Sequence, residues 1–438
     1  MTAGQVNDQN IQTDIMDLIS SQALASFLVE FLHKSSYKDE LQLPRNELED
    51  LYSFTSSFIA GNTKIAQAMS EYVHATFFFL PLNIRKAVAV YNGFQMVMDN
   101  IPQEANDSLD LLCSQLATSE GVKHPASQQF FKFLPQLFAH YGPYAQTTMF
   151  RGALEFMQAT CLERTLFRGY PGSKYPHYLR RMGSQGPVQA AACFPKSEFP
   201  QEEFLPVIAT IESELEYFVG IVNDLFSFYK ESSSSYEKTN YPLNQAACTQ
   251  QDVSVVLQEG LDTAIAYQKR TMNIVKGIGN EAVSQRVRQF FTGYTRYHLA
   301  CPRYRIADLC LESGNTDLAY FYCMSCKALG VPAVGFPGML LRSESPTPES
   351  ARKAMVAGHG YASEINGNIH ERAHKQDLTN GSGDSDARSM GIGVEVLANS
   401  YGIDVLGEAS IEVIGEIGFG GQSPRSCQRS GEGIALVR

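Results

Sequence analysis

Three oxygen-bearing side chains stand four residues apart in one apolar segment, at Asn223, Ser227 and Glu231. In an α-helix, residues at i, i+4 and i+8 form one row along one face. Carboxamide, hydroxyl and carboxylate oxygens are hard donors that suit Mg²⁺ and leave room for phosphate oxygens. The row would be about 12 Å long, but a Glu side chain tilts back toward the helix N-terminus and can reach the ion that the shorter Asn holds. The spacing therefore predicts one shared magnesium ion.

The alternative interpretation is a solvent-exposed helix end in which Ser227 and Glu231 form an ordinary i, i+4 pair. The neighbours of the row are mostly large and apolar, which leaves little room for a plainly exposed surface. They are Val222, Leu225, Phe226, Phe228 and Tyr229. These neighbours favour the metal site.

The row lies within a sequence that is helical almost throughout. From about residue 13 to residue 329, apolar residues recur at i, i+3, i+4 and i+7. The expected helices are Ile15–Leu32, Leu48–Ile59, Ile65–Phe78, Ile84–Met98, Phe130–His140, Gln146–Leu166 and Glu202–Glu231. Gly and Pro residues separate them, among them Gly61, Pro125 and Pro143. The pattern predicts an all-α protein with one large helical bundle over residues 13–335.

The two ends of the chain differ in composition from this bundle. Residues 1–12 are polar and are expected to be disordered. Residues 336–438 are rich in Gly, Ser and Pro, with low-complexity stretches such as Ser343–Ser350. Segments of this kind bury too little apolar surface to offset the entropy of ordering. We expect a mostly disordered C-terminal tail.

Composition excludes several classes of function. The net charge of −11 gives no counterion release on DNA or RNA, so no nucleic-acid partner is expected. No apolar stretch approaches the ~20 residues of a membrane span. The first 15 residues do not resemble a signal peptide. Nine scattered cysteines follow no disulfide framework, which favours a reducing, cytoplasmic setting.

The row belongs to a longer motif, Asn223-Asp-Leu-Phe-Ser227-Phe-Tyr-Lys-Glu231, that resembles the second metal motif of class I terpene synthases. With Lys before Glu, it is similar to the fungal trichodiene synthase-like sesquiterpene cyclases. Two further stretches resemble that family: residues 167–182, with Tyr-Pro-Gly-Ser and Leu-Arg-Arg-Met, and His298–Arg305, with Arg-Tyr. The resemblance spans roughly residues 70–330 and does not reach the tail.

The resemblance implies a site that holds a prenyl diphosphate through three Mg²⁺ ions and several basic groups. It implies that Asn223, Ser227 and Glu231 hold one ion and that Lys230 contacts the diphosphate. Arg180, which lies 43 residues before Asn223, matches the diphosphate-sensing arginine. The remaining two matches form the pair that closes over the leaving group, Arg303 and Tyr304. The chemistry suits these residue types, because Arg binds phosphate oxygens through paired hydrogen bonds and cations stabilise charge on a departing oxygen.

The first metal motif departs from the family pattern. Asp99 follows the expected helix Ile84–Met98 and fits the leading metal-binding aspartate. Asn100 stands where a second acid would be, and Pro102 disturbs the residues after it. Glu104 or Asp107 could substitute as an acid beside the metal ligands. The departure leaves two outcomes open: retained metal binding through Asp99, or an inactive relative.

The resemblance also implies an apolar, aromatic-lined cavity, since aromatic faces stabilise carbocations. Its expected wall residues are Phe94, Phe156, Tyr294 and Tyr297. The function implied is ionisation and cyclisation of farnesyl diphosphate to a cyclic sesquiterpene, releasing diphosphate. The alternative is a catalytically impaired relative that binds prenyl diphosphate or a protein partner without turnover. Members of this family often form dimers, so a homodimer is also expected, without an assigned interface.

Overall fold

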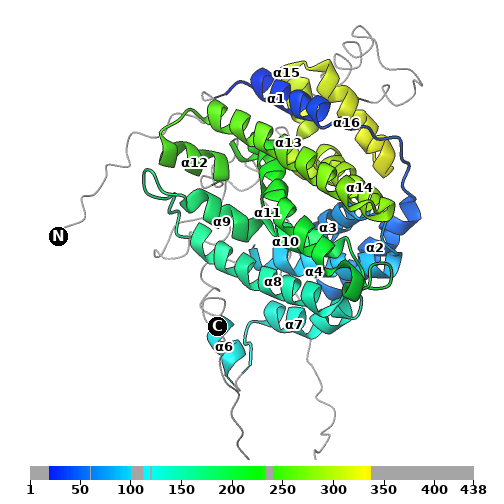
Figure 1. Ribbon diagram of the computed structural model, residues 1–438. Coiled ribbons are helices and arrows are strands. Elements are labelled where there is room, and N and C mark those ends of the chain that lie inside the picture. The colour runs from blue at the N-terminus through cyan, green and yellow to red at the C-terminus, as the bar shows by residue number, and fades with distance from the viewer. Residues whose placement is uncertain (1–18, 60, 100–111, 119–120, 233–239, 337–438) are drawn as a thin grey trace, which may run out of the picture. The chain divides into compact units, whose positions relative to one another are not determined.

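The computed structural model describes residues 19–59, 61–99, 112–118, 121–232 and 240–336. This part of the chain is built from α-helices with short connections and one 3-10 turn, and it contains no strand (Figure 1). The all-α prediction is therefore confirmed for these residues. The expected N-terminal segment 1–12 and almost all of the tail, residues 337–438, lie outside them.

The N-terminal helices match the expected segments to within a few residues, apart from the start of the first. They are α1 (Ser21–Lys34), α2 (Arg45–Phe58), α3 (Thr63–Thr76) and α4 (Leu82–Asp99). The first was expected from Ile15 but begins at Ser21, because the Ser20 hydroxyl caps it by accepting from the Ala23 backbone N–H. Helix α4 packs against α2 and α3 and ends at Asp99.

The middle of the chain adds α6 (Leu112–Ala117), α7 (Pro125–Phe138), α8 (Pro143–Glu163), α9 (Tyr175–Ser184), α10 (Gly186–Ala192) and α11 (Gln201–Ser232). Proline opens α7 and α8, because its fixed φ suits the first helical position and its missing N–H costs nothing there. This rule places the start of α7 at Pro125, earlier than the expected Phe130.

The C-terminal helices are α12 (Tyr241–Thr249), α13 (Val253–Ile278), α14 (Glu281–Ala300), the 3-10 turn η4 (Pro302–Tyr304), α15 (Ile306–Ser313) and α16 (Thr316–Leu329). Asparagine side chains cap the N-termini of α12, α14 and α16. Glycines with positive φ follow α13, α15 and α16, where only glycine adopts the left-handed turn without strain.

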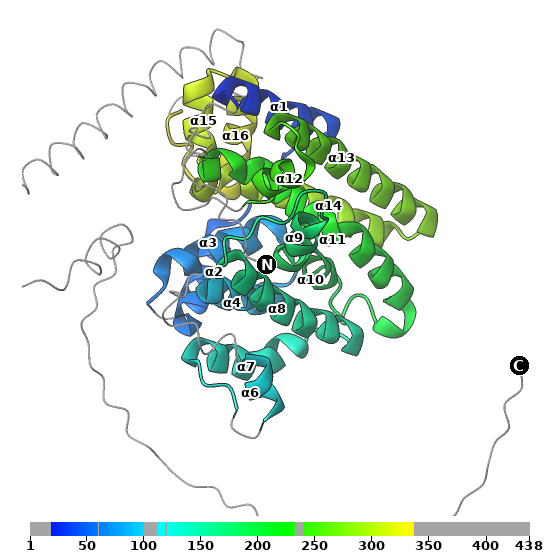
Figure 2. The same cartoon turned by 90° about the vertical axis from the view of Figure 1, so that its left-hand side faces the viewer.

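Helix α11 runs through the middle of the bundle and contacts α1, α8, α9, α10, α12, α13, α14 and η4 (Figure 1). Helices α1, α15 and α16 pack together at one end, and α7 packs on α4 at the other (Figure 2). Within the described residues, no helix combines the length and apolar character of a membrane span.

A close approach fixes the join between α9 and α10 beside α11. Gln185 takes a left-handed conformation with φ of 55°, which ends α9. Gly186 then lies so close to α11 that a Cβ atom would come within 2.3 Å of the Leu215 carbonyl oxygen. Glycine at this position lets the α9–α10 corner sit directly on the central helix.

A fully buried ion pair anchors the segment between α1 and α2. The Arg296 guanidinium donates to both oxygens of Asp39, at 2.6 and 2.8 Å, and to the Ala75 carbonyl oxygen at 2.9 Å. Both side chains of the pair are 0% exposed. The Tyr37 hydroxyl donates to Asp39 at 2.9 Å and lies 2.7 Å from the Ser325 hydroxyl. The network ties this segment to α3, α14 and α16.

We expect Asp39→Ala to lower the free energy of unfolding by about 3–5 kcal/mol, because it leaves the Arg296 charge buried and uncompensated. Urea unfolding measures the change. The matched control is Asp308→Ala, which breaks a surface pair with Arg305 whose side chains are 45% and 50% exposed and 2.8 Å apart. That change should cost less than about 1 kcal/mol. Equal effects of the two substitutions would contradict the anchor.

Candidate active site

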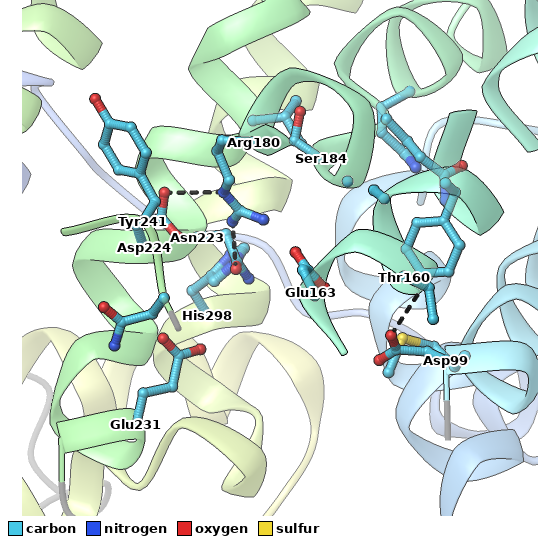
Figure 3. Close-up of a pocket in the computed structure, with 18 of the residues that line it drawn as sticks. Asp99, Thr160, Glu163, Arg180, Ser184, Asn223, Asp224, Glu231, Tyr241 and His298 are labelled. Carbon is cyan, nitrogen blue, oxygen red and sulfur yellow. Dashed lines mark hydrogen bonds and ion pairs between the residues drawn. The ribbon is translucent and has the colours of Figure 1, made fainter. Parts of the chain in front are cut away.

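A cavity of about 400 Å³ opens beside the C-terminal half of α11. Residues of α3, α4, α8, α9, α10, α11, α12, α14 and η4 contribute to its wall. Figure 3 shows polar side chains facing one another across it, with Glu231 and Asn223 on one wall and Asp99 on the opposite one. The volume is within the range of cavities that hold small molecules.

The predicted row lies on α11 at this wall. Asn223 and Glu231 line the cavity. Ser227, midway between them in the sequence, does not line the cavity. This residue is only 2% exposed. Its hydroxyl oxygen is buried and has no hydrogen-bond partner in the described part of the chain. A buried hydroxyl without a partner is unusual in a folded protein and marks an oxygen available to a ligand.

Arg180 joins α9 to α11. Its Nε donates to Asp224 at 2.9 Å, and one terminal nitrogen donates to the Gly220 carbonyl oxygen at 3.0 Å and to Asn223 Oδ1 at 2.8 Å. Burial alone would lower the pKa of Arg180, but the carboxylates of Asp224 and Glu231 outweigh burial and raise it. Burial raises the pKa of Asp224, and the Arg180 charge opposes that rise. The predicted arginine is thus held charged at the cavity wall.

The amide nitrogen of Asn223 faces residues of α14 and η4. Its Nδ2 donates to the Tyr304 hydroxyl at 3.0 Å and lies 3.2 Å from His298 Nε2. His298 Nδ1 is 2.7 Å from the Tyr294 carbonyl oxygen. Burial lowers the pKa of His298 to about 3, so the imidazole is neutral at physiological pH.

Asp99 stands on the opposite wall at the C-terminal end of α4. The Thr160 hydroxyl donates to its Oδ1 at 3.4 Å. Glu163, on α8, also lines the cavity, and Figure 3 shows it between the Asp99 and Asn223 walls. Burial and the neighbouring Asp99 raise the pKa of Glu163 to about 7. The altered residues after Asp99, including Asn100 and Glu104, lie outside the described residues.

Two more of the predicted basic residues reach the same cavity. Lys230 and Arg303 both line it, and Lys230 Nζ is 3.9 Å from Glu231. With Arg180 they bring three cationic side chains to a cavity whose walls also carry several acids. This arrangement suits a polyanionic ligand bridged to carboxylates by divalent cations.

Three of the four residues expected in the aromatic wall line the cavity. Phe156, Tyr294 and Tyr297 line the cavity. The prediction that Phe94 lines the cavity is wrong. Its ring packs instead against Phe130 and Phe133, at centroid distances of 5.9 and 6.3 Å. Its position on α4 turns it toward α7 and the hydrophobic core.

The wall is also more polar than expected. The amide side chains of Asn92, Gln185 and Gln189 lie among the residues that line the cavity. The Tyr72 hydroxyl donates to Gln189 Oε1 at 2.7 Å, and Gln189 Nε2 donates to Asn92 Oδ1 at 3.3 Å. These bonds fix the amides against the aromatic residues around them.

Sequence reasoning missed Glu163 and gave His298 no role. Helical spacing offered a signal for both. Glu163 follows the predicted wall residue Phe156 by seven positions, so it lies on the same face of α8. His298 follows Tyr294 by four positions on α14, which likewise places the two side chains on one face.

The sequence comparisons agree with this geometry. The model of the family described as trichodiene synthase (TRI5) matches residues 57–339. The chain belongs to this family. All the predicted site residues fall within the matched region. That region ends at residue 339, close to residue 336, where the described residues end.

The relatives in this family carry several activities in their names. The terpene cyclase pbrA of Penicillium brasilianum is 27% identical over 61% of this chain and 64% of that protein. A trichodiene synthase of Stachybotrys chartarum is 25% identical over 51% of this chain and 58% of that enzyme. An (E)-beta farnesene synthase of Metarhizium brunneum is 26% identical over 64% of this chain and 86% of that enzyme. The chain thus spans about six tenths of the length of the first two relatives.

The residues present fit the Mg²⁺ that the family implies. On α11, Asn223 and Glu231 offer oxygens to the cavity and the Ser227 hydroxyl is buried without a partner in the described part. Asp99 offers a carboxylate from the opposite wall. Within the described residues, however, no three His, Cys, Asp or Glu side chains gather closely enough to hold a metal by themselves. A mixed set of amide, hydroxyl and carboxylate oxygens, completed by phosphate oxygens, is the donor set that suits Mg²⁺.

We expect Glu163→Gln to change how stability depends on pH in the ligand-free protein. The folded state holds the Glu163 proton more tightly than the unfolded chain, whose pKa is near 4.5. The unaltered protein therefore loses stability as the pH rises from about 4.5 through 7, and the variant lacks this loss. Its free energy of unfolding, relative to the unaltered protein, should rise between about pH 5 and pH 8.

Denaturant unfolding at several pH values tests this expectation. The control is Glu202→Gln, which changes an exposed carboxylate in the first turn of α11. A difference between Glu163→Gln and the unaltered protein that stays constant with pH would refute a buried, proton-retaining Glu163.

Proposed function

We propose that this protein is a magnesium-dependent sesquiterpene cyclase that ionises farnesyl diphosphate and cyclises its C15 chain. The observation that carries the proposal is the meeting of Asn223 and Glu231 with Arg180, Arg303 and Tyr304 around one cavity. Family membership supports terpene cyclisation as the reaction class, and the names of the relatives include a C15 product, farnesene.

The polar end of the cavity would bind the diphosphate. Asn223, Ser227 and Glu231, with Asp99 opposite, would hold Mg²⁺, which when bound supplies positive charge that favours departure of the diphosphate. Arg180, with Lys230, Arg303 and Tyr304, would donate hydrogen bonds to the diphosphate oxygens. The carbon–oxygen bond then breaks, and its electron pair leaves with the diphosphate.

The aromatic part of the cavity would receive the hydrocarbon chain. Phe156, Tyr294 and Tyr297 line it, and Tyr72 adds a fourth ring. Aromatic faces stabilise a passing cation. The Tyr72 hydroxyl donates to Gln189, which fixes the orientation of that ring in the wall. Exclusion of water from this part of the cavity would protect the carbocation while the chain folds.

The alternative is a relative that binds prenyl diphosphate without turnover. Its support is Asn100, which stands where the family has a second acid. The intact α11 row and the three cationic side chains favour catalysis. One assay separates the two functions.

Purified protein incubated with farnesyl diphosphate and Mg²⁺ is expected to release a C15 product that gas chromatography–mass spectrometry detects. Removing Mg²⁺ should abolish it. The double variant Asn223→Ala/Glu231→Ala should lower turnover by about 100-fold or more, since it removes stabilisation of the developing charge. Glu202→Gln, on the same helix but distant from the row, should keep full activity.

Binding of farnesyl diphosphate with no product from the unaltered protein would reject the cyclase and support the non-catalytic alternative. Equal turnover by the double variant would reject the assigned metal row. Parallel incubations with geranyl and geranylgeranyl diphosphates test the chain length. A preferred C10 or C20 substrate would correct the farnesyl assignment.

A further inference from the structure

His298 is buried beside Asn223 at the cavity wall and takes part in a directed set of hydrogen bonds. We infer that His298 is a positioning residue that holds the Asn223 amide with its oxygen turned toward the metal and its nitrogen turned away. The inference rests on the proposed function, because it concerns the metal that Asn223 would bind. His298 would thus support the metal site without contacting the metal.

The direction of each hydrogen bond follows from the groups at the two ends. Arg180 carries only donors, so the Asn223 atom that it meets at 2.8 Å must be the carbonyl oxygen Oδ1. The amide nitrogen then faces His298 Nε2 at 3.2 Å, and this ring nitrogen must accept. At the far end, the Tyr294 carbonyl oxygen can only accept, so His298 Nδ1 carries the proton and donates at 2.7 Å.

The imidazole cannot easily turn to another partner. His298 is 1% exposed. Its ring lies against those of Tyr294 and Tyr304 at centroid distances of 4.4 and 4.5 Å, and Phe226 lies 5.6 Å away. Ring packing on several sides fixes the plane of the imidazole, and the Tyr294 bond fixes which nitrogen faces Asn223.

A second hydrogen bond between the same two helices holds the pair in register. The Tyr294 hydroxyl donates to the Val219 carbonyl oxygen at 2.8 Å. Val219 lies one turn before Asn223 on α11, and Tyr294 lies one turn before His298 on α14. The two bonds, one turn apart, set the distance from the imidazole to the amide. Supporting hydrogen bonds of this kind are what keep a metal-binding side chain in its productive orientation.

Tyr304 also accepts from the Asn223 amide nitrogen, at 3.0 Å, but it is less suited to this role. In the proposed reaction its hydroxyl also donates to the diphosphate, so its position depends on the ligand as well as on Asn223. Both ring nitrogens of His298 are engaged, Nε2 with Asn223 and Nδ1 with the Tyr294 carbonyl oxygen. The Asn223 oxygen has two lone pairs and can accept from Arg180 and face a metal at once.

The test compares Mn²⁺ affinity in the presence of inorganic pyrophosphate, followed by the electron paramagnetic resonance signal of free Mn²⁺. His298→Phe keeps a ring of similar size and removes the acceptor. We expect Mn²⁺ to bind about 10- to 100-fold more weakly, the usual cost of losing a group that supports a metal ligand. His298→Gln, whose side-chain oxygen can replace Nε2 as the acceptor, should restore affinity close to that of the unaltered protein.

A double-variant cycle separates positioning from general damage. If His298 acts through Asn223, His298→Phe should have no further effect on Mn²⁺ affinity once Asn223→Ala is present. Tyr141→Phe is the matched control: it removes a buried hydroxyl bonded to the Ala192 carbonyl oxygen at 3.1 Å, away from the cavity lining. That variant should keep the unaltered Mn²⁺ affinity. Thermal unfolding of each variant verifies that it is folded.

Unchanged Mn²⁺ affinity in His298→Phe would overturn the inference, as would an equal loss with and without Asn223. Product formation from farnesyl diphosphate is scored separately. A protein that shows the expected Mn²⁺ pattern but makes no product supports the inference and rejects the proposed reaction. If the unaltered protein makes product and His298→Phe binds Mn²⁺ normally, the proposed reaction is supported and the inference about His298 is rejected.

Discussion

The Arg180 guanidinium is the group around which the polar end of the cavity is built. Three of its hydrogen bonds reach α11, to Asp224, Asn223 and the Gly220 carbonyl oxygen. Asp224 is 5% exposed and would be costly to bury without a cation beside it. The acids of α11 can therefore gather at one place in the ligand-free protein because one fixed positive charge already stands among them.

That arrangement depends on how α9 meets α11. Arg180 reaches the central helix because the chain turns sharply at Gln185 and Gly186 packs against the α11 backbone. A larger residue than glycine would push α9 outward and draw the guanidinium away from Asp224. Packing at this corner, on Leu215 and Glu216, thus determines the electrostatics of a site about two turns further along α11.

The helices and the α11 row could be predicted from the sequence because both depend on spacing along one element. The periodicity of apolar residues placed α2, α3 and α4 to within a few residues, and the i, i+4, i+8 spacing identified Asn223 and Glu231. Contacts between distant segments could not be read this way. Phe94 shares the apolar pattern of α4, yet its side chain belongs to the core, and the periodicity alone does not say which of two apolar surroundings a ring meets. Glu163 and His298 enter the site because α8 and α14 both pack against α11, which the sequence does not show.

The anchor between Asp39 and Arg296 has a consequence for the newly made chain. The two residues are 257 positions apart, so Asp39 leaves the ribosome long before its partner is synthesised. At typical rates of synthesis the wait is roughly 10–50 s. During that time the carboxylate must stay hydrated, and the segment around it has no place to dock. Closing so long a loop is entropically expensive. Helix α1 and the segment after it are synthesised before Arg296. They are therefore expected to be among the last parts of the bundle to pack in place.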